Sequence, residues 1–400
     1  MEALFETACR KIDEEAEELR SLSHLIWSNP ELNFEEKDSH NVITDFLEKR
    51  GFRVQRNYVL ETAFSAEWVN CGKLSWELPH IMVLCEYDAL PEIGHACGHN
   101  LITELGVAAG MGVKAAMEEN QGLVGKLTIL GTPAEEGGGG KAYLIEAGAF
   151  KGVHAALMAH PAPFNIDDPT TLAVKFVEVT YHGKAAHSSV SPWQGINALD
   201  AAVHAYTGIS HLRQQIRPSG RVHGIITKGG TKSNIVPDLC KMEYTIREDT
   251  LANLDLLCDK VVGCLQAAAL ATGCTVEVEW EAKPYADMRN NETLVSVYQR
   301  HIERLEPGRQ AHKGEKEAFK GSTDMGNVSH EVPSIHPFYY VGNELNHTNE
   351  FTALAGSEGA QLFTLNQGKA MSMTCIEMMM DKTLLQRAAS DFQSTKARQD

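Results

Sequence analysis

Residues 81–100 read IMVLCEYDALPEIGHACGHN, and this stretch indicates the fold more clearly than any other. Its first part, 81–87, is a short apolar run that passes into a polar loop, which is typical of a buried strand. Similar apolar runs occupy 124–130 and 153–159. Patterns typical of helices precede and separate these runs, at 4–28, 37–50, 100–119 and 141–149. Strand and helix in alternation predict a largely parallel sheet covered by helices, and therefore an α/β domain.

The middle of the chain follows a different pattern. After Pro169 we expect a strand, a helix, two strands, a helix and a strand, at 172–183, 194–216, 221–229, 238–248, 251–271 and 274–283. This order is the split β-α-β-β-α-β unit of ferredoxin-like folds. We therefore predict that 172–285 is an inserted α+β domain, and that 1–171 and 286–400 together form one discontinuous α/β domain.

The composition excludes several kinds of partner. Lys and Arg number 36 against 53 Asp and Glu, which gives 36 − 53 = −17, and a charge of this sign repels nucleic-acid phosphates and anionic lipid. We expect neither a nucleic-acid nor a membrane partner. The longest apolar helical stretch, 101–117, is interrupted by Glu104 and Lys114, so no segment is expected to span a bilayer.

The cysteines and the N-terminal sequence indicate the compartment. Nine scattered cysteines, an odd number in a long chain, do not suggest a disulfide framework. The opening MEALFETACRKIDEEAEELR is acidic and amphipathic, and it lacks the basic start and apolar core of a secretory signal. We therefore expect a reduced, cytoplasmic, globular protein.

Candidate metal ligands follow the predicted strands. Cys97 and His99 lie in the loop after the first strand, at the end of the sheet where α/β proteins place their ligands. A thiolate and an imidazole are good ligands for zinc or a similar metal. A single Cys-x-His pair is nevertheless more often a buried thiol beside a loop histidine, so the assignment needs further residues.

Two adjacent carboxylates follow the second strand. Glu135 and Glu136 precede four glycines at 137–140. Like charges repel and glycines cost conformational entropy, so a merely structural turn would not favour this sequence. A metal explains the pair if one carboxylate binds the ion and the other faces a water molecule on it.

Two histidines complete the candidate cluster. His160 follows the third predicted strand, and His347 lies in the sequence NHT near Phe351. Each alone is more often structural. Because three consecutive strand ends bring Cys and His, two Glu, and His to one edge of one sheet, we predict a metal site there.

Three polar residues of the inserted domain also stand out. His187 follows the first strand of that domain and is as easily read as an ordinary loop histidine. Asn234 and Arg247 flank another strand, and Arg247 lies in an apolar stretch, where an arginine normally needs an anionic partner.

Taken together these motifs resemble the metallopeptidase-20 family, which includes aminoacylases, dipeptidases, carboxypeptidases and indole-acetyl-amino-acid hydrolases. The motifs occur in the family's order and span most of the chain. They read CEYDALPEIGHACGHN, GTPAEEGGGGK, MAHPAP, GKAAHS, SNIVPD and HT-x-x-F. The resemblance implies a metal-dependent exopeptidase-like catalytic domain with an inserted ferredoxin-like domain that serves as a lid and forms a homodimer.

The resemblance also implies roles for individual residues. The ligands of one or two divalent ions, Zn or Mn, would be Cys97, His99, Glu136, His160 and His347. Glu135 would be the general base, and His187 would reach the active site of the partner subunit. The substrate carboxylate would be held by Asn234, Arg247, Gly321, Ser322 and Thr323. Many relatives have Asp where this chain has Asn100, which leaves the metal affinity and the number of ions open.

The resemblance is strongest to a branch of dipeptidases that prefer a basic C-terminal residue, as in β-alanyl-lysine, Xaa-Lys, Xaa-Orn or Xaa-Arg. We therefore expect metal-dependent hydrolysis of such dipeptides, with acidic residues such as Asp324 near the cationic side chain. The alternatives are an amidohydrolase for N-acyl amino acids of the indole-acetyl or aminobenzoyl type, a non-catalytic binding protein of the same fold, and a metal-storage or sensor protein. Retention of all the candidate ligands and of Glu135 disfavours the binding protein, and the paired carboxylates disfavour the storage protein.

Overall fold

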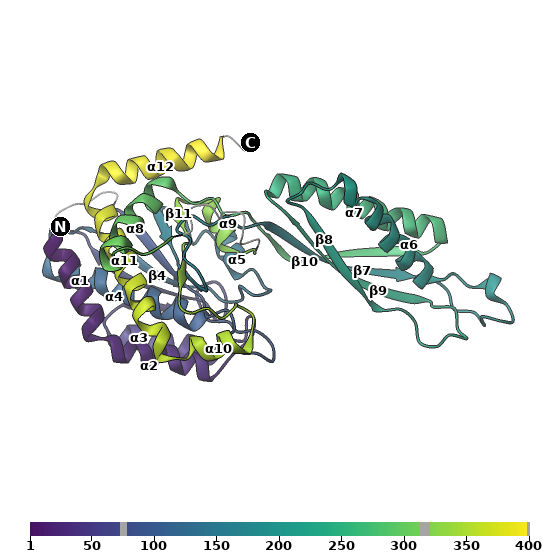
Figure 1. The fold of residues 1–400 in the computed structure, drawn as a ribbon, viewed down its shortest axis with the longest axis horizontal. Coiled ribbons are helices and arrows are strands. Elements are labelled where there is room, and N and C mark those ends of the chain that lie inside the picture. The colour runs from purple at the N-terminus through teal and green to yellow at the C-terminus, as the bar shows by residue number, and fades with distance from the viewer. Residues whose placement is uncertain (73–77, 312–320, 398–400) are drawn as a thin grey trace. The chain divides into compact units, whose positions relative to one another are not determined.

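The computed structural model describes residues 1–72, 78–311 and 321–397 (Figure 1). The chain forms two compact units. Unit 1 consists of Met1–Thr170 and Met288–Asp400, and unit 2 of Thr171–Asp287.

The main sheet of unit 1 has six strands in the order β1-β2-β4-β3-β5-β11. Four of them are mutually parallel, as expected, while β1 and β2 join one edge antiparallel. The sequence analysis did not identify these two edge strands, so the sheet is more mixed than predicted. A second, two-stranded parallel sheet pairs β6 with β12. The bounds are β1 Arg53–Arg56, β2 Phe64–Asn70, β3 His80–Cys85, β4 Gly125–Gly131, β5 Ala155–Leu157, β6 His160–Ala162, β11 Ser334–Ile335 and β12 Phe338–Tyr340.

Helix α4, His99–Glu119, is central to unit 1 and almost wholly buried against the sheet. Two of its glycines allow this close packing. A Cβ at Gly106 would lie 2.6 Å from Cys85 Sγ, and one at Gly110 would lie 2.3 Å from Ile129 Cδ1. The other α-helices of the unit are α1 Glu2–Glu14, α2 Ala16–Ser28, α3 Lys37–Lys49, α5 Gly140–Glu146, α8 Glu292–Leu305, α9 Met325–Ser329, α10 Asn349–Ala355, α11 Gln361–Met380 and α12 Lys382–Lys396. Because α4 begins at a ligand candidate, its tight packing fixes that residue against the strand ends.

Three expected elements differ in extent. The helix predicted over 4–28 is two helices, α1 and α2, separated at Glu15. The strand predicted at 153–159 is reduced to the three residues of β5. The helix predicted at 194–216 contracts to α6, Ala198–His211, because the Asn197 side chain caps it by accepting hydrogen bonds from two backbone N–H groups.

Unit 2 has the ferredoxin-like element order that the sequence predicted. Its strands form one antiparallel sheet in the order β10-β7-β9-β8. Burial alternates along β9, whose buried side chains belong to the core beneath α6 and α7, while the other face of the sheet is more exposed. The remaining bounds are β7 Ala173–His182, β8 Arg221–Lys228, β9 Leu239–Glu248, α7 Leu251–Thr272 and β10 Thr275–Tyr285.

The described helices of both units fall short of the requirements of a membrane span. Of the helices in the described residues, none combines the length and the apolar composition needed to cross a bilayer.

Candidate metal centre

The five predicted ligands lie together in unit 1. Their ligand atoms form overlapping groups of three. Within each group, all the ligand atoms lie within 4.8 Å of one another. His160 Nε2 lies 3.3 Å from Cys97 Sγ. Glu136 Oε1 lies 3.8 Å from His99 Nε2 and 3.5 Å from His347 Nε2. The structure thus brings together residues that lie far apart in the sequence.

Local backbone geometry brings the loop with Cys97 close to His160 and His347. Gly98 has φ +82°, and a Cβ there would lie 2.6 Å from Pro161 Cγ, so glycine lets the loop with Cys97 approach the strand that begins at His160. The backbone N–H of His347 donates a hydrogen bond to Ala96 O at 2.8 Å, which ties the third histidine to the same loop.

Two buried atoms of the cluster have no hydrogen bond among the described residues. These atoms are His99 Nε2 and Glu136 Oε1. Buried polar atoms are normally paired, because an unpaired one loses its hydration without compensation. A metal ion would satisfy both atoms, and sulfur, imidazole and carboxylate are its usual ligands. The residues present therefore fit a divalent metal.

Asp88 contacts two of the ligand candidates and orients them. His99 Nδ1 lies 3.0 Å from Asp88 Oδ1 and 2.9 Å from Asp88 O, which directs the lone pair of Nε2 into the cluster. Asp88 Oδ2 also accepts a hydrogen bond from the Glu136 backbone N–H at 2.9 Å. One carboxylate thus fixes two ligand candidates. The sequence analysis quoted the motif that contains Asp88 but gave this residue no role.

Asn100 does not take part in the cluster. It is fully buried, and its Nδ2 donates hydrogen bonds to Ser23 Oγ and Ala355 O, both at 3.0 Å. These contacts join α4 to α2 and α10. The carboxylate that supports His99 is Asp88, so the amide at position 100 does not remove that charge from behind the ligands.

The two adjacent glutamates are electrostatically distinct. Burial, followed by the negative charges of Glu86 and Glu136, raises the pKa of Glu135 well above its usual value. Burial acts on Glu136 in the same direction, but the contact with His347 at 3.5 Å and the charge of His99 outweigh it and lower the pKa of Glu136. Neighbouring carboxyls with pKa values shifted apart are suited to different tasks, one as a ligand and one as a proton acceptor.

A buried ion network lies beside Glu135. Lys141 Nζ donates hydrogen bonds to Glu86 Oε1 at 2.5 Å and to Asp324 Oδ1 at 2.6 Å, and all three side chains are fully buried. Glu86 Oε2 lies 3.5 Å from His99 Nε2. The expectation that Asp324 faces a cationic substrate group is therefore wrong, because its carboxylate already forms a buried ion pair with Lys141. A buried lysine inside a glycine-rich stretch gives no recognisable signal in the sequence.

The glycine run has a steric cause. Gly139 has φ +67°, and a Cβ at Gly140 would lie 2.0 Å from Pro133 O. Side chains at these positions would push the loop apart. The run therefore allows the backbone to fold back tightly on itself just after Glu135 and Glu136.

The predicted substrate-binding residues divide between the two units. Gly321, Ser322 and Thr323 lie in unit 1 directly before α9, where Thr323 Oγ1 accepts a hydrogen bond from the Met325 backbone N–H at 3.1 Å. His187 and Asn234 lie in unit 2 in neighbouring loops, as Ser188 N–H donates to Asn234 O at 3.1 Å and His187 bridges to Ile235.

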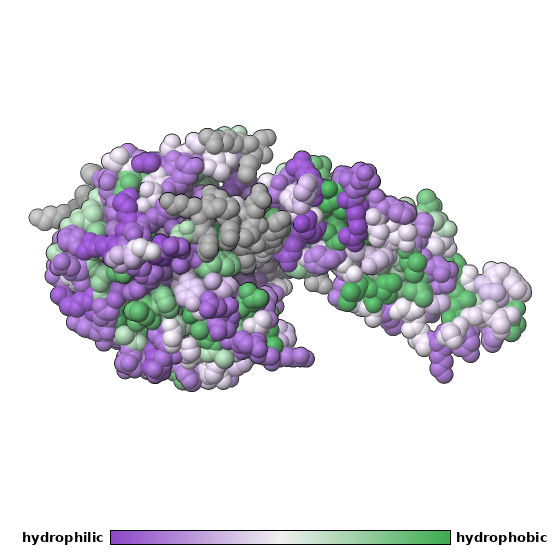
Figure 2. Space-filling model, in the orientation of Figure 1, coloured by the Kyte–Doolittle hydropathy of each residue, from purple (hydrophilic) through white to green (hydrophobic). Residues whose placement is uncertain are grey.

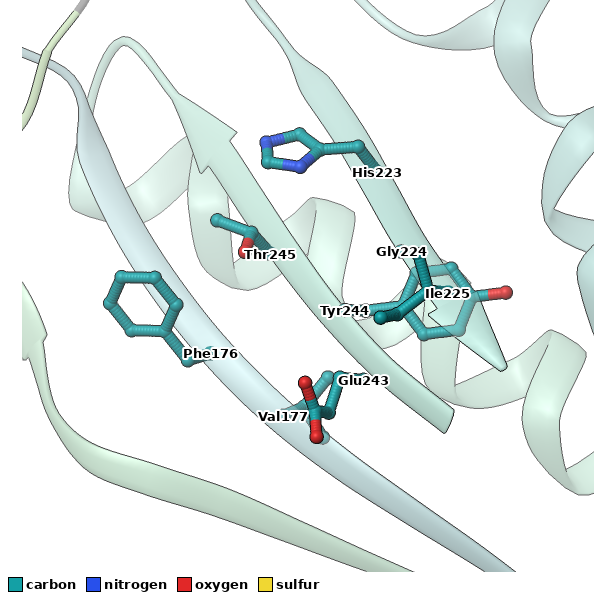
Figure 3. A pocket seen from close by; sticks show the side chains of 8 residues that line it. All are labelled: Phe176, Val177, His223, Gly224, Ile225, Glu243, Tyr244 and Thr245. Atoms are coloured by element: carbon teal, nitrogen blue, oxygen red, sulfur yellow. The ribbon is translucent and has the colours of Figure 1, made fainter. Parts of the chain in front are cut away.

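Arg247 lies on β9 of unit 2, on the sheet face that α6 and α7 leave open. Burial lowers its pKa, so its charge is poorly hydrated there. The same face carries a groove of about 320 Å³, shown in Figure 3, between Phe176 on one side and His223 and Ile225 on the other. Glu243 contributes its carboxylate to this groove, and it lies four residues before Arg247 on the same strand face.

Comparison with known proteins places the chain in a family. Residues 82–360 match peptidase family M20/M25/M40. The chain is 46% identical over 399 residues to Xaa-Arg dipeptidase of Mus musculus, covering 98% of this chain and 93% of that protein. It is 28% identical to one of the subunits of p-aminobenzoyl-glutamate hydrolase from Escherichia coli, covering 96% and 93%. The chain therefore belongs to peptidase family M20, as the sequence motifs predicted, and it is a hydrolase.

Solved structures agree on the fold. A dinuclear metal-binding peptidase of family M20 from Bacillus subtilis superposes with a TM-score of 0.63 at 21% identity, covering 89% of this chain and 98% of that one. The α/β fold class is thereby confirmed. The family also removes the reading of the chain as a non-catalytic binding protein.

Proposed function

We propose that the protein hydrolyses the amide bond of dipeptides whose C-terminal residue is basic, as in β-alanyl-lysine, Xaa-Lys, Xaa-Orn and Xaa-Arg. The main observation behind this proposal is the cluster of five ligand candidates. Two buried atoms of this cluster have no hydrogen bond among the described residues, and the cluster lies beside Glu135, whose pKa is raised. The 46% identity to a protein named Xaa-Arg dipeptidase supports the choice of a basic residue.

The cofactor in this proposal is one or two divalent ions, Zn or Mn. Cys97, His99 and His160 offer sulfur and imidazole, which suit zinc. Cys97 also belongs to a second group, with Glu136 and His347, so the ligand set has room for two neighbouring ions. When bound, the metal supplies a lowered pKa for the attacking water and polarises the carbonyl of the scissile bond.

The chain's own residues perform the remaining steps. Glu135 accepts the proton of the attacking water and then passes it to the leaving amine. His187 donates a hydrogen bond to the developing oxyanion. Arg247 binds the substrate carboxylate through two guanidinium N–H groups, and the loop Gly321–Thr323 completes this contact together with Asn234, which the second copy supplies along with its neighbour His187. Unit 2 in this proposal is a lid that closes over a small substrate.

The groove of unit 2 supports a cationic leaving group. Glu243 forms no ion pair or hydrogen bond with the described residues, whereas nearby Glu178 pairs with Lys241 at 2.6 Å. Four residues of a strand span about 13 Å, so a lysyl or arginyl side chain whose carboxylate binds Arg247 extends toward Glu243. The aromatic ring of Phe176 lines the same groove as Glu243 (Figure 3) and offers an apolar surface to the methylene groups of such a side chain.

A homodimer formed through unit 2 is part of the proposal. Strand β8 lies at one edge of the sheet, and its exposed residues include Ile225 and Ile226. Helix α6 exposes Val203 and Tyr206. Hydrophobic residues are visible on the surface of unit 2 in Figure 2. An edge strand with exposed apolar side chains favours pairing with a second copy across a two-fold axis.

We assign the enzyme to the cytoplasm. All nine cysteines are free, and six of them are buried in the two units. Unpaired thiols are typical of a reducing compartment.

A substrate panel tests the proposed function. Wild-type protein is assayed on β-alanyl-lysine, alanyl-arginine, alanyl-norleucine and p-aminobenzoyl-glutamate, before and after removal of metal with a chelator. We expect the basic dipeptides to be preferred and all activity to disappear with the metal. The variant His99→Ala should lose metal and activity, while His204→Ala, an exposed histidine on α6, should keep both. Preference for the acyl-glutamate would instead support the amidohydrolase reading, which the Escherichia coli relative favours.

A further inference from the structure

A buried carboxylate outside the metal cluster contacts the loop that carries the catalytic glutamate. Glu36 precedes α3 and has no exposed surface. Its Oε1 accepts hydrogen bonds from the backbone N–H groups of Phe34 at 3.0 Å and Ala134 at 2.9 Å. Its Oε2 accepts one from the Thr62 hydroxyl at 2.8 Å. The proposed mechanism does not use Glu36, so these contacts need another explanation.

Ala134 is the residue that needs such support. It directly precedes Glu135 and has φ +60°, the left-handed region that residues with a side chain rarely adopt. Such a conformation persists only where the surroundings determine it. Ala134 O accepts hydrogen bonds from Gly138 N–H at 3.0 Å and Gly139 N–H at 2.8 Å, and Glu36 satisfies its N–H. Both polar backbone groups of the strained residue are thus held.

The segment around Glu36 also fits the glycine run sterically. A Cβ at Gly138 would lie 2.4 Å from Phe34 Cε2, and one at Gly137 would lie 2.8 Å from Asn33 Nδ2. The residues Asn33–Glu36 therefore lie directly against the loop. The absence of side chains in the run permits this contact as well as the tight turn.

We propose that Glu36 is a positioning residue, which fixes the backbone of Ala134 and so places the carboxylates of Glu135 and Glu136 relative to the histidine and cysteine ligands. Its role is to accept two backbone hydrogen bonds at a set distance, and its negative charge is not required. The inference rests on the proposed role of Glu135, but not on which amide is the substrate.

Three substitutions separate distance from charge. Glu36→Gln keeps an oxygen at the same reach for both N–H groups, and its amide donates to Thr62 Oγ1. Glu36→Asp keeps the charge, but it is one methylene shorter and does not reach Ala134. Glu36→Leu removes the acceptor altogether and leaves two buried N–H groups unpaired.

Kinetics and zinc affinity are measured for each variant, the latter by competition with a chromogenic chelator. We expect Glu36→Gln to keep kcat within about threefold of wild type. Glu36→Asp and Glu36→Leu should lower kcat by about 100-fold, with KM nearly unchanged, because a displacement of about 1 Å has this effect on catalysis. Zinc affinity should fall in the latter two variants and not in Glu36→Gln, since Glu136 is displaced with Glu135.

Glu31 provides a matched control. Its carboxylate also accepts two backbone hydrogen bonds, from Asp38 at 2.9 Å and Ser39 at 2.8 Å, but these stabilise only the start of α3. Glu31→Leu should lower the melting temperature without a selective loss of kcat or zinc affinity. If Glu36→Leu does not fold, the comparison of Glu36→Gln with Glu36→Asp still shows whether the length of the side chain or its charge is required.

Two results would overturn the proposal. One is an active Glu36→Asp beside an inactive Glu36→Gln, which would show that the charge matters. The other is full activity in both variants. The wild-type panel shows separately which amide is cleaved, and the comparison is made on that substrate. A wrong substrate class is therefore distinguishable from a wrong role for Glu36.

Discussion

His187 and Arg247 lie at opposite ends of the strand pair β7–β9, Arg247 within β9 and His187 in the loop beyond β7. Arg247 is paired with Val174 at the start of β7, whereas His187 follows the end of β7, where His182 is paired with Leu239. Eight residues of β9 separate these two ends, which is about 27 Å. A dipeptide backbone spans about 7 Å, so one substrate molecule cannot contact both residues of one unit 2. This separation supports the proposal that His187 serves the active site of a second copy.

Subunit mixing tests this arrangement. His187→Ala and Glu135→Gln proteins, each inactive alone, are combined under conditions that allow subunit exchange. If His187 acts on the partner's site, a mixed dimer contains one site lacking both residues and one intact site. Up to about a quarter of wild-type activity should then return, since half of the dimers are mixed and each has one working site. A mixture that stays inactive after verified exchange, or a monomeric mass in solution, would rule it out.

Glu135→Gln should lower kcat by about 10²–10⁴-fold while metal content and KM stay close to wild type. Glutamine has nearly the same shape as glutamate but cannot take the proton of the attacking water. Metal analysis and steady-state kinetics measure the two properties separately. Glu331→Gln, an exposed glutamate, is the control and should be unchanged. A Glu135→Gln protein with near wild-type kcat would assign the proton transfer to another group.

Glu243→Gln should raise KM for lysyl and arginyl dipeptides by about fivefold and leave alanyl-norleucine unaffected. The reason is the loss of one charged partner in the groove, an exposed contact worth about 1 kcal/mol. Glu279→Gln, an exposed glutamate on β10, serves as the control. Equal changes for the basic and the neutral substrate would place the cationic side chain elsewhere.

Glu104 makes stability depend on pH. Burial raises its pKa to about 7 from an ordinary value of 4.5, and its Oε1 has no hydrogen bond among the described residues. The Glu104 carboxyl therefore binds its proton more tightly in the folded protein than in the unfolded chain. The contribution to stability is fully present below pH 4.5 and is lost as pH rises to about 7, by about 3 kcal/mol.

The variant Glu104→Gln carries no such proton. The fall in the urea midpoint between about pH 5 and pH 8 should be smaller in Glu104→Gln than in wild type, although Glu36, whose pKa burial also raises to about 7, keeps part of the slope in both. Glu118→Gln, an exposed change near the end of the same helix, should retain the full slope. Parallel pH profiles for all three proteins would contradict this origin.

The sequence identified the ligand candidates because strand ends in an α/β sheet meet at one edge. Cys97, His99 and Glu136 each follow an apolar run that could be recognised without a structure. The edge strands β1 and β2 were missed, since their mixed polar and apolar residues resemble loops. Partly buried edge strands carry a weak pattern.

The supporting residues could not have been found in this way. Asp88, Lys141 and Glu36 act through contacts with residues 11 to 183 positions away. Nothing in their local sequence distinguishes them from exposed charged residues. Only the fold shows that each is buried and which group it holds.

The loop after Glu136 limits how this enzyme can be altered. A side chain at Gly140 would meet Pro133 O, and one at Gly138 would meet the ring of Phe34. Directed evolution toward other amides should therefore find few tolerated changes in this loop. Tolerated changes in specificity should instead gather on the open sheet face of unit 2, around Glu243 and His223, where side chains border a groove rather than a packed core.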